Sequence, residues 1–429
     1  MVQLTGAGQI RSALLKRKER LLTMVQTFLN FLRAYRNMED FLSLEQSKRK
    51  IVFYSEDTHS IIHFKEVIQC LVEQYDEDVC YLTSDPEDPI LKKHPLKVKP
   101  YYVGQGSVRT ALFFKMLADL LIMTMPDLGT FCLKRSRDYP VHYLYLFHAM
   151  VSTHSTYRKA AFDNYDTIFC TGTYQISEIR ETEKVYKLPE KQLIEVGYGK
   201  LESFMEEEVA YRKHHGSPSS GQKTIIIAPS WGKRAILEFC GIELINTLLE
   251  AGYKTIVRPH PMDAQRNPQL INNITQLFNG NINFLLNVDM QHNNTLFESH
   301  LMISDWSGAA IEYAFACERP VIFIDVPRKC NNPEADKISH TPMEVSIREE
   351  IGRVIRPDKI HTLPKVIEDL YDDKKYFTSR IRKLREKSVF NLGISNQVAA
   401  EHIIEIAERQ YQNNCNRPAT SPLLNKSSA

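Results

Sequence analysis

Residues 301–327 read LMISDWSGAAIEYAFACERPVIFIDVP, and this stretch decides the fold class. An apolar run ends at Ser304-Asp305, small residues follow at Ser307-Gly308, and a helical stretch then leads into a second apolar run. The order strand, turn, helix, strand is typical of a βαβ unit in a parallel sheet. The polar residues of this unit lie at its first turn.

The chemistry of that turn favours an anion. The first N–H groups of a helix lack intrahelical partners, and the positive end of the helix dipole points out of the turn. Gly308 permits close approach of a ligand to the backbone, and Ser304 and Ser307 add hydroxyl donors. Helix capping by Ser304 and Asp305 explains the same residues equally well from this stretch alone.

Two further strand ends carry polar groups of the same kind. The segment TIVRPHP at residues 255–261 ends an apolar strand in Arg258 and in His260, which lies between Pro259 and Pro261. The strand TIIIA runs into a turn that offers Ser230 and Lys233. Cationic and hydroxyl groups at the strand ends of an open α/β sheet are typical of a phosphate or pyrophosphate site.

Composition indicates an ordinary globular chain. It has 429 residues, 43% hydrophobic and 25% charged, which is enough for two domains. The net charge of +2 gives no indication of nucleic-acid binding. The eight cysteines form no CxxC pair, so we expect reduced core thiols and no zinc site. No apolar run is long enough to predict a membrane-spanning helix.

The alternation of strand and helix patterns predicts two doubly wound parallel sheets. We expect the chain to divide as follows: a basic amphipathic helical arm at 1–48, a Rossmann-like domain at 49–204, a linker at 205–222, a second Rossmann-like domain at 223–395, a helix at 396–411 that folds back on the first domain, and a disordered tail at 412–429.

His148 ends the buried strand VHYLYLFHAM and is the candidate general base. A neutral imidazole at the carboxyl end of a strand can take a proton from a hydroxyl nucleophile near pH 7. The neighbouring His142 and His154 leave open the alternative that any of the three is a structural histidine.

The first 48 residues predict a surface helix. Leu21, Val25, Phe28 and Leu32 recur at helical spacing beside a cluster of Lys and Arg. Residues 1–50 hold ten Lys or Arg against four Asp or Glu, a local excess of +6. Such a helix can lie on an anionic membrane. The alternative is a helix that packs on the domain behind it.

Taken in order, the motifs FHAM, APSWG, RPHP and SDWSGAAIEYAFACERPVIF resemble the CDP-glycerol glycerophosphotransferase family of bacterial wall and surface polymer synthesis. The resemblance covers roughly residues 51–396. The family's first motif usually reads Trp-His-Gly, and here Phe147-His148-Ala149 takes its place. This departure puts the identity of the acceptor in doubt.

The resemblance implies a GT-B-like fold with two Rossmann-like domains facing a cleft, and transfer of a polyol phosphate from a CDP-activated donor to a hydroxyl with release of CMP. By similarity, His148 would be the base, His260 with Arg258 would hold the donor phosphates, and Glu312 would bind the ribose. Asp305 would line the donor site, or else orient His260 or a substrate hydroxyl. The predicted catalytic residues are His148, His260 and Asp305, and the predicted donor-binding residues are Ser230, Lys233, Arg258, His260, Ser304, Ser307, Gly308 and Glu312.

The implied partners are a CDP-polyol, a lipid-linked or polysaccharide acceptor, and an anionic membrane surface, on the inner face of the cytoplasmic membrane. We expect no required cofactor and no metal site, although Mg²⁺ could accompany the donor. Three alternatives stay open: a GT-B glycosyltransferase that uses a nucleotide sugar, a CDP-ribitol-dependent transferase, and a non-catalytic membrane-associated assembly protein.

Overall fold

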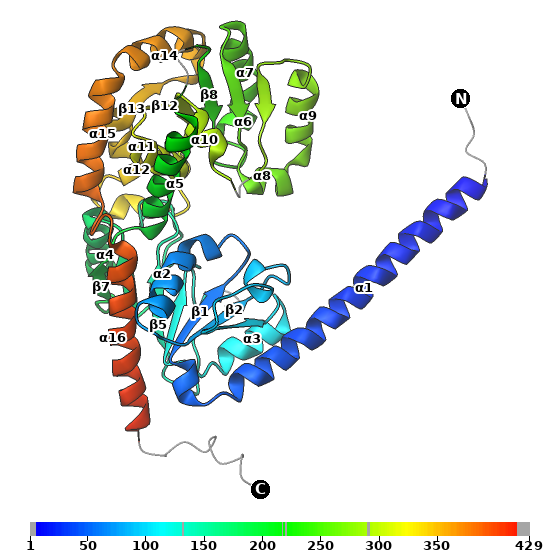
Figure 1. Cartoon of the computed structure of the whole chain (residues 1–429), viewed down its shortest axis with the longest axis vertical. Helices are drawn as coiled ribbons and strands as arrows, with labels where there is room; N and C mark the ends of the chain where they lie inside the picture. Colours follow the sequence, from blue (N-terminus) through cyan, green and yellow to red (C-terminus); the bar gives the residue numbers. More distant parts are fainter. Residues whose placement is uncertain (1–5, 131–132, 217, 219–220, 290–291, 418–429) are drawn as a thin grey trace. The chain divides into compact units, whose positions relative to one another are not determined.

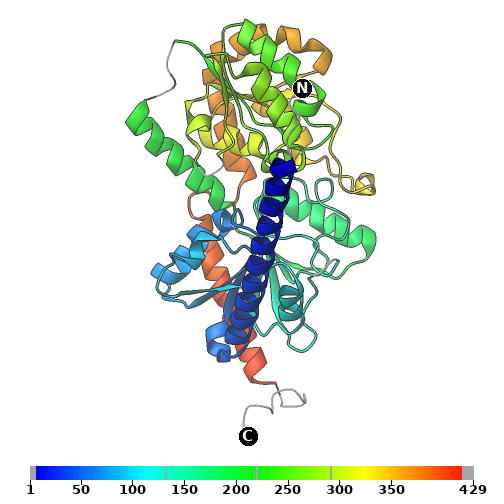
Figure 2. The same ribbon diagram turned by 90° about the vertical axis from the view of Figure 1, so that its right-hand side faces the viewer.

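A computed structural model describes residues 6–130, 133–216, 218, 221–289 and 292–417 (Figures 1 and 2). The chain separates into two compact units. The N-terminal unit comprises Met1–Leu146, Ala161–Ile168 and Ala399–Ala429, and the C-terminal unit comprises Phe147–Ala160 and Phe169–Val398. The excursion Phe147–Ala160 follows a strand of the first sheet, yet it belongs to the C-terminal unit.

The first sheet has seven strands in the order β3-β2-β1-β4-β5-β6-β7. Pairing is parallel between β1 and β2, β1 and β4, β2 and β3, and β4 and β5. The strands are β1 (Ile51–Ser55), β2 (Val79–Thr83), β3 (Val98–Tyr102), β4 (Leu120–Met123), β5 (His142–Leu146), β6 (Thr167–Cys170) and β7 (Gln192–Glu195). All residues of β1, β2 and β4 are buried, as a sheet covered on both faces requires.

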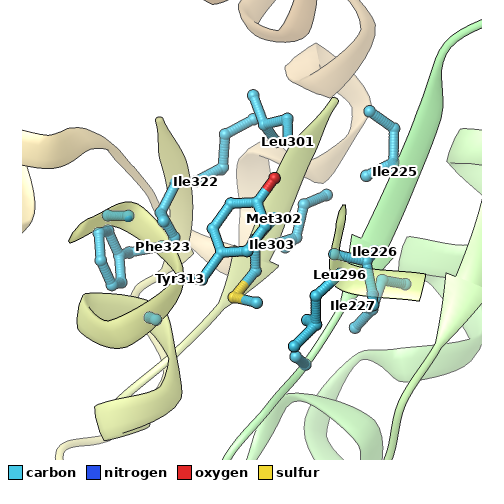
Figure 3. Close-up of a cluster of buried hydrophobic side chains, with 14 of the residues drawn as sticks. Ile225, Ile226, Ile227, Leu296, Leu301, Met302, Ile303, Tyr313, Ile322 and Phe323 are labelled. Carbon is cyan, nitrogen blue, oxygen red and sulfur yellow. The ribbon is translucent and has the colours of Figure 1, made fainter. Parts of the chain in front are cut away.

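The second sheet has six strands in the order β10-β9-β8-β11-β12-β13, all paired in parallel. The strands are β8 (Thr224–Ile227), β9 (Lys254–Val257), β10 (Phe284–Leu286), β11 (Leu301–Ser304), β12 (Val321–Ile324) and β13 (Gly352–Ile355). Figure 3 shows Ile226, Met302 and Ile322 from adjacent strands with Tyr313 in one buried cluster. The predicted α/β fold with two parallel sheets is confirmed. In each sheet the strand order reverses next to the first strand, where open α/β sheets bind ligands.

Helices lie between many of the strands and at both ends of the described chain. They are α1 (Gly6–Leu42), α2 (Ile61–Glu73), α3 (Ser107–Phe114), α4 (Thr173–Tyr186), α5 (Gly199–His215), α6 (Ile236–Phe239), α7 (Gly241–Glu250), α8 (Pro261–Arg266), α9 (Pro268–Phe278), α10 (Asn294–Glu298), α11 (Gly308–Cys317), α12 (Met343–Ser346), α13 (Arg348–Ile351), α14 (Leu363–Asp372), α15 (Lys374–Ser388) and α16 (Ser395–Cys415). Short 3-10 turns are η1 (Gln46–Arg49), η2 (Pro89–Leu91), η3 (Ala335–Lys337) and η4 (Pro357–Thr362).

The predicted linker at 205–222 needs correction, because residues 205–215 are the larger part of α5. The inner face of this helix includes Leu201, Phe204 and Glu208 at helical spacing. The buried Glu208 pairs with Arg212 and with Arg319. Because the charged Glu208 occupies an inner-face position, the helical repeat of apolar residues is interrupted, and the sequence resembles an irregular polar segment.

Helix α1 is continuous in both views and lies outside the first sheet (Figures 1 and 2). Its C-terminal part buries Ala34, Met38 and Phe41, and Phe41 packs edge-to-face on Tyr101 at 5.6 Å between ring centroids. Between Leu21 and Phe31 the apolar residues are largely exposed, with Phe28 at 60%. The C-terminal end of the helix is therefore anchored, and the stretch from Leu21 to Phe31 presents apolar side chains.

Helix α16 extends the predicted helix 396–411 as far as Cys415, so the predicted tail is corrected for residues 412–415. The Asn414 amide donates to Asp119 at 2.6 Å, and the Tyr75 hydroxyl donates to Glu401 at 2.7 Å. These bonds seat α16 on the N-terminal unit. Residues 418–429 of the predicted tail lie outside the described residues.

Candidate active site

His148 lies just beyond β5, where the chain leaves the first sheet and joins the C-terminal unit. Its side chain is half-buried and meets the Tyr157 ring edge-to-face, with 5.8 Å between ring centroids. Its backbone carbonyl lies 2.9 Å from the Tyr198 hydroxyl. Both contacts lie within the C-terminal unit, so this unit determines where the imidazole sits.

The segment that bears His148 packs against the first turn of α11. Ser307 is the N-cap of this helix, and its hydroxyl accepts from the Ala309 N–H at 3.3 Å. A Cβ atom at Gly308 would lie 3.1 Å from Val151 Cγ1 and 3.7 Å from Ala149 Cβ. Gly308 therefore allows a close approach between the helix start and this segment. The structure brings His148, Ser307 and Gly308 into one neighbourhood.

Glu312 lies on the second turn of α11 and is buried. Its carboxylate accepts from the Tyr198 hydroxyl at 2.8 Å and from Lys200 Nζ at 2.8 Å. Burial and the nearby Glu312 raise the pKa of Tyr198, so its hydroxyl keeps the proton that it donates. Each carboxylate oxygen has a second lone pair, so the ribose role of Glu312 stays a prediction.

Asp305 ties down the loop that follows β8. It is 1% exposed; its Oδ1 accepts from the Ser230 N–H at 2.7 Å and its Oδ2 from the Ile236 N–H at 3.1 Å. Burial raises the pKa of Asp305, and these backbone bonds offset part of the rise. Both oxygens face loop amides, so the geometry favours a structural role over the predicted catalytic one.

Ser304 and Arg258, two predicted donor-binding residues, are buried. The Ser304 hydroxyl is fully buried and donates to the Ala228 carbonyl at 2.6 Å, which argues against direct contact with a donor. The Arg258 guanidinium is also buried and reaches Asn293 Oδ1 at 3.4 Å, and burial lowers its pKa. Lys233, by contrast, is exposed.

His260 is the N-cap of α8, and one hydrogen bond indicates which of its ring nitrogens carries the proton. Its Nδ1 lies 3.1 Å from the Met262 N–H, which can only donate. Nδ1 must therefore carry a lone pair, and the proton of the neutral ring lies on Nε2. His260 thus presents an Nε2–H donor suited to a phosphate oxygen.

Four residues that the sequence did not single out gather beside His260. Lys329 Nζ lies 3.8 Å and Arg266 Cζ 4.9 Å from the centroid of the Trp231 ring. Asp263 Oδ1 accepts from the Gly232 N–H at 3.2 Å, and burial raises the pKa of Asp263 to about 6. Burial also lowers the pKa of Lys329. Lys329 follows the end of strand β12, and this position could have identified it from the sequence as a candidate site residue.

Among the described residues, no group of three or more His, Cys, Asp or Glu side chains is arranged to hold a metal ion.

Residues 117–328 match the model of the CDP-glycerol:poly(glycerophosphate) glycerophosphotransferase family. This similarity to the family covers just under half of the chain. No curated protein sequence gives a significant match to the chain.

Solved structures share its fold. A variant of the wall teichoic acid polymerase TagF soaked with CDPG superposes with a TM-score of 0.55 at 14% identity, covering 94% of this chain and 99% of that one. A TagF variant without the soak gives 0.57 at 14% identity over 93% and 99%. UDP-GlcNAc 2-epimerase from Neisseria meningitidis gives 0.52 at 11% identity over 82% and 99%. At these identities the likeness shows the fold alone.

Proposed function

We propose that this chain transfers glycerol phosphate from CDP-glycerol to a hydroxyl of a surface-polymer or lipid-linked acceptor and releases CMP. The family match supports the reaction class. The observation that supports this site is the packing of the His148 segment on the first turn of α11. The proposed base, His148, and the proposed anion site at the first turn of α11 both lie in the C-terminal unit.

The proposed reaction is an in-line displacement at the glycerol-bearing phosphorus. The His148 imidazole takes the proton of the acceptor hydroxyl, whose oxygen forms the new P–O bond. The P–O bond to CMP breaks, and CMP leaves with the electron pair. Negative charge builds on the phosphate oxygens, where the His260 Nε2–H, the Ser307 hydroxyl and the N–H groups of α11 can stabilise it. The His148 imidazolium then returns its proton to water.

His148→Ala tests this mechanism. We expect turnover to fall on the order of 10²-fold or more, with donor affinity nearly unchanged, because a general base acts on the transition state. His214→Ala, at an exposed position on α5, is the matched control. Equal CMP release by wild type and His148→Ala would refute the assignment.

We also propose that α1 lies on the anionic inner face of the cytoplasmic membrane. Leu21, Val25 and Phe28 are exposed at helical spacing, and Arg17 and Lys18 are exposed beside them. An apolar stripe flanked by cations fits the boundary between lipid tails and anionic headgroups. No helix in the described part of the chain is long and apolar enough to cross a membrane.

We expect transfer to need no metal, because cationic and N–H groups of the chain itself can meet the developing charge. CMP release in the presence of EDTA tests this. Loss of activity with EDTA that Mg²⁺ restores would show that the ion accompanies the donor.

A further inference from the structure

Residues 152–156, which follow the His148 segment, form a buried stretch without helix or strand. Ser152, Thr153, His154 and Ser155 are all buried. Buried backbone polar groups need hydrogen-bond partners. Within the stretch, the Ser152 hydroxyl accepts from the Ser155 N–H at 3.4 Å and lies 3.1 Å from His154 Nδ1. The other partners of this stretch come from elements far away in the sequence.

Two buried carboxylates accept its N–H groups. Glu344, on α12, accepts from the Ser152 N–H at 2.9 Å and from the Thr156 hydroxyl at 3.0 Å. Glu178, on α4, accepts with one oxygen from both the N–H and the hydroxyl of Thr153, at 2.6 and 2.7 Å. Burial raises the pKa of Glu344, and the Ser152 N–H offsets part of that rise.

The loop after β12 holds the carbonyl side of the same stretch. The Asn332 amide donates to the His154 carbonyl at 2.9 Å, and the Asn331 N–H donates to the Ser155 carbonyl at 3.0 Å. The Arg328 guanidinium donates to the Ser155 hydroxyl at 2.6 Å. The stretch is therefore fastened from α4, from α12 and from this loop.

We propose that Glu178 and Glu344 are positioning residues that fix His148 beside the start of α11. Only residues 149–151 separate His148 from Ser152, and they are packed: Met150 lies in the core of the C-terminal unit, and its two neighbours lie against Gly308. A displacement of Ser152 must therefore move His148. The expected effect on catalysis rests on the phosphotransfer reaction proposed above.

The hydrogen-bond pattern predicts which substitutions keep the clamp. Glu344→Gln retains an oxygen for the Ser152 N–H, and its amide can donate to the Thr156 hydroxyl, which then accepts. Glu178→Gln retains the single oxygen that serves Thr153. The two Glu→Ala variants leave buried N–H groups without an acceptor.

Hydrogen–deuterium exchange of peptides covering residues 148–157 is the primary test, because it does not depend on activity. We expect faster exchange there in Glu344→Ala and Glu178→Ala, and exchange near wild type in both Gln variants. Glu202→Ala is the matched control: this buried carboxylate accepts from the N–H groups of Gly393 and Ser395, at 2.7 and 3.0 Å, and should leave residues 148–157 unchanged.

Turnover is the second readout. In the Ala variants we expect kcat for CMP release to fall about 10²-fold, as a displaced catalytic group does, with donor affinity nearly unchanged. The double variant Glu344→Ala with His148→Ala should have about the same kcat as His148→Ala alone, because both substitutions remove the contribution of the same imidazole. The Gln variants should restore kcat.

Unchanged exchange in both Ala variants would overturn the proposal, and so would faster exchange with unchanged kcat. If wild type releases no CMP while exchange responds as expected, the phosphotransfer assignment fails and the clamp itself is supported. Should the Ala variants not fold, Thr153→Val removes one hydroxyl bond to Glu178 and must still raise exchange of residues 148–157.

Discussion

Replacing Asp305 tests the structural role that its geometry indicates. Asp305→Ala leaves the buried N–H groups of Ser230 and Ile236 without an acceptor, at a cost of about 1–3 kcal/mol each. The two bonds together give a loss of about 2–6 kcal/mol in the free energy of unfolding. Because the raised pKa shows that burying this charge is itself unfavourable, we expect the lower part of that range.

Asp305→Asn refines the test. Its amide oxygen can accept from one of the two N–H groups, but its NH₂ group faces the other, so about half of the loss should remain. Urea denaturation measures both variants, and Asp372→Ala, at an exposed position, is the control. A change below about 0.5 kcal/mol, within the range of ordinary surface substitutions, together with a large fall in kcat would refute the structural role and support a catalytic one.

Three further predictions concern other parts of the molecule. His260→Asn keeps an N-cap acceptor but loses the Nε2–H, so calorimetry should show donor affinity weakened about tenfold or more; unchanged affinity would contradict the phosphate contact. The folded pKa of Asp263, about 6, lies above its unfolded value of 3.8, so the native protein holds more protons between these pH values. The wild type should therefore lose stability relative to Asp263→Asn as pH rises from about 4 to 6, and a constant difference in Tm would refute this. Phe28→Glu should reduce sedimentation with phosphatidylserine vesicles more than Thr23→Glu on the opposite helix face; equal effects would argue against an apolar membrane contact.

The sheets could be predicted because their signal is local. The apolar runs at β8, β9, β11 and β12 each end in turn residues, which is enough to predict parallel strands and polar strand ends. The structure places the N-cap of α11 at Ser307 rather than at Ser304 or Asp305, and the neighbours that approach Gly308 closely are Ala149 and Val151.

Two features could not be predicted from the sequence: the direction in which a side chain points, and contacts between residues far apart in the chain. Ser304 ends a strand like a ligand-binding serine, but its hydroxyl points into the fold toward Ala228. The partners of Glu344 lie near Ser152, almost two hundred positions earlier, so no spacing rule reveals them. For the same reason the transfer of residues 147–160 to the C-terminal unit is invisible in the local pattern.

The most direct measurement is calorimetric titration of wild type and His148→Ala with CDP-glycerol, CDP-ribitol, UDP-glucose and UDP-N-acetylglucosamine, followed by an assay for CMP release with an acceptor polymer. The account predicts selective binding of CDP-glycerol by both proteins and CMP release by wild type, with His148→Ala slower by about 10²-fold or more. Selective binding of a UDP-sugar, or equal turnover by the two proteins, would contradict it.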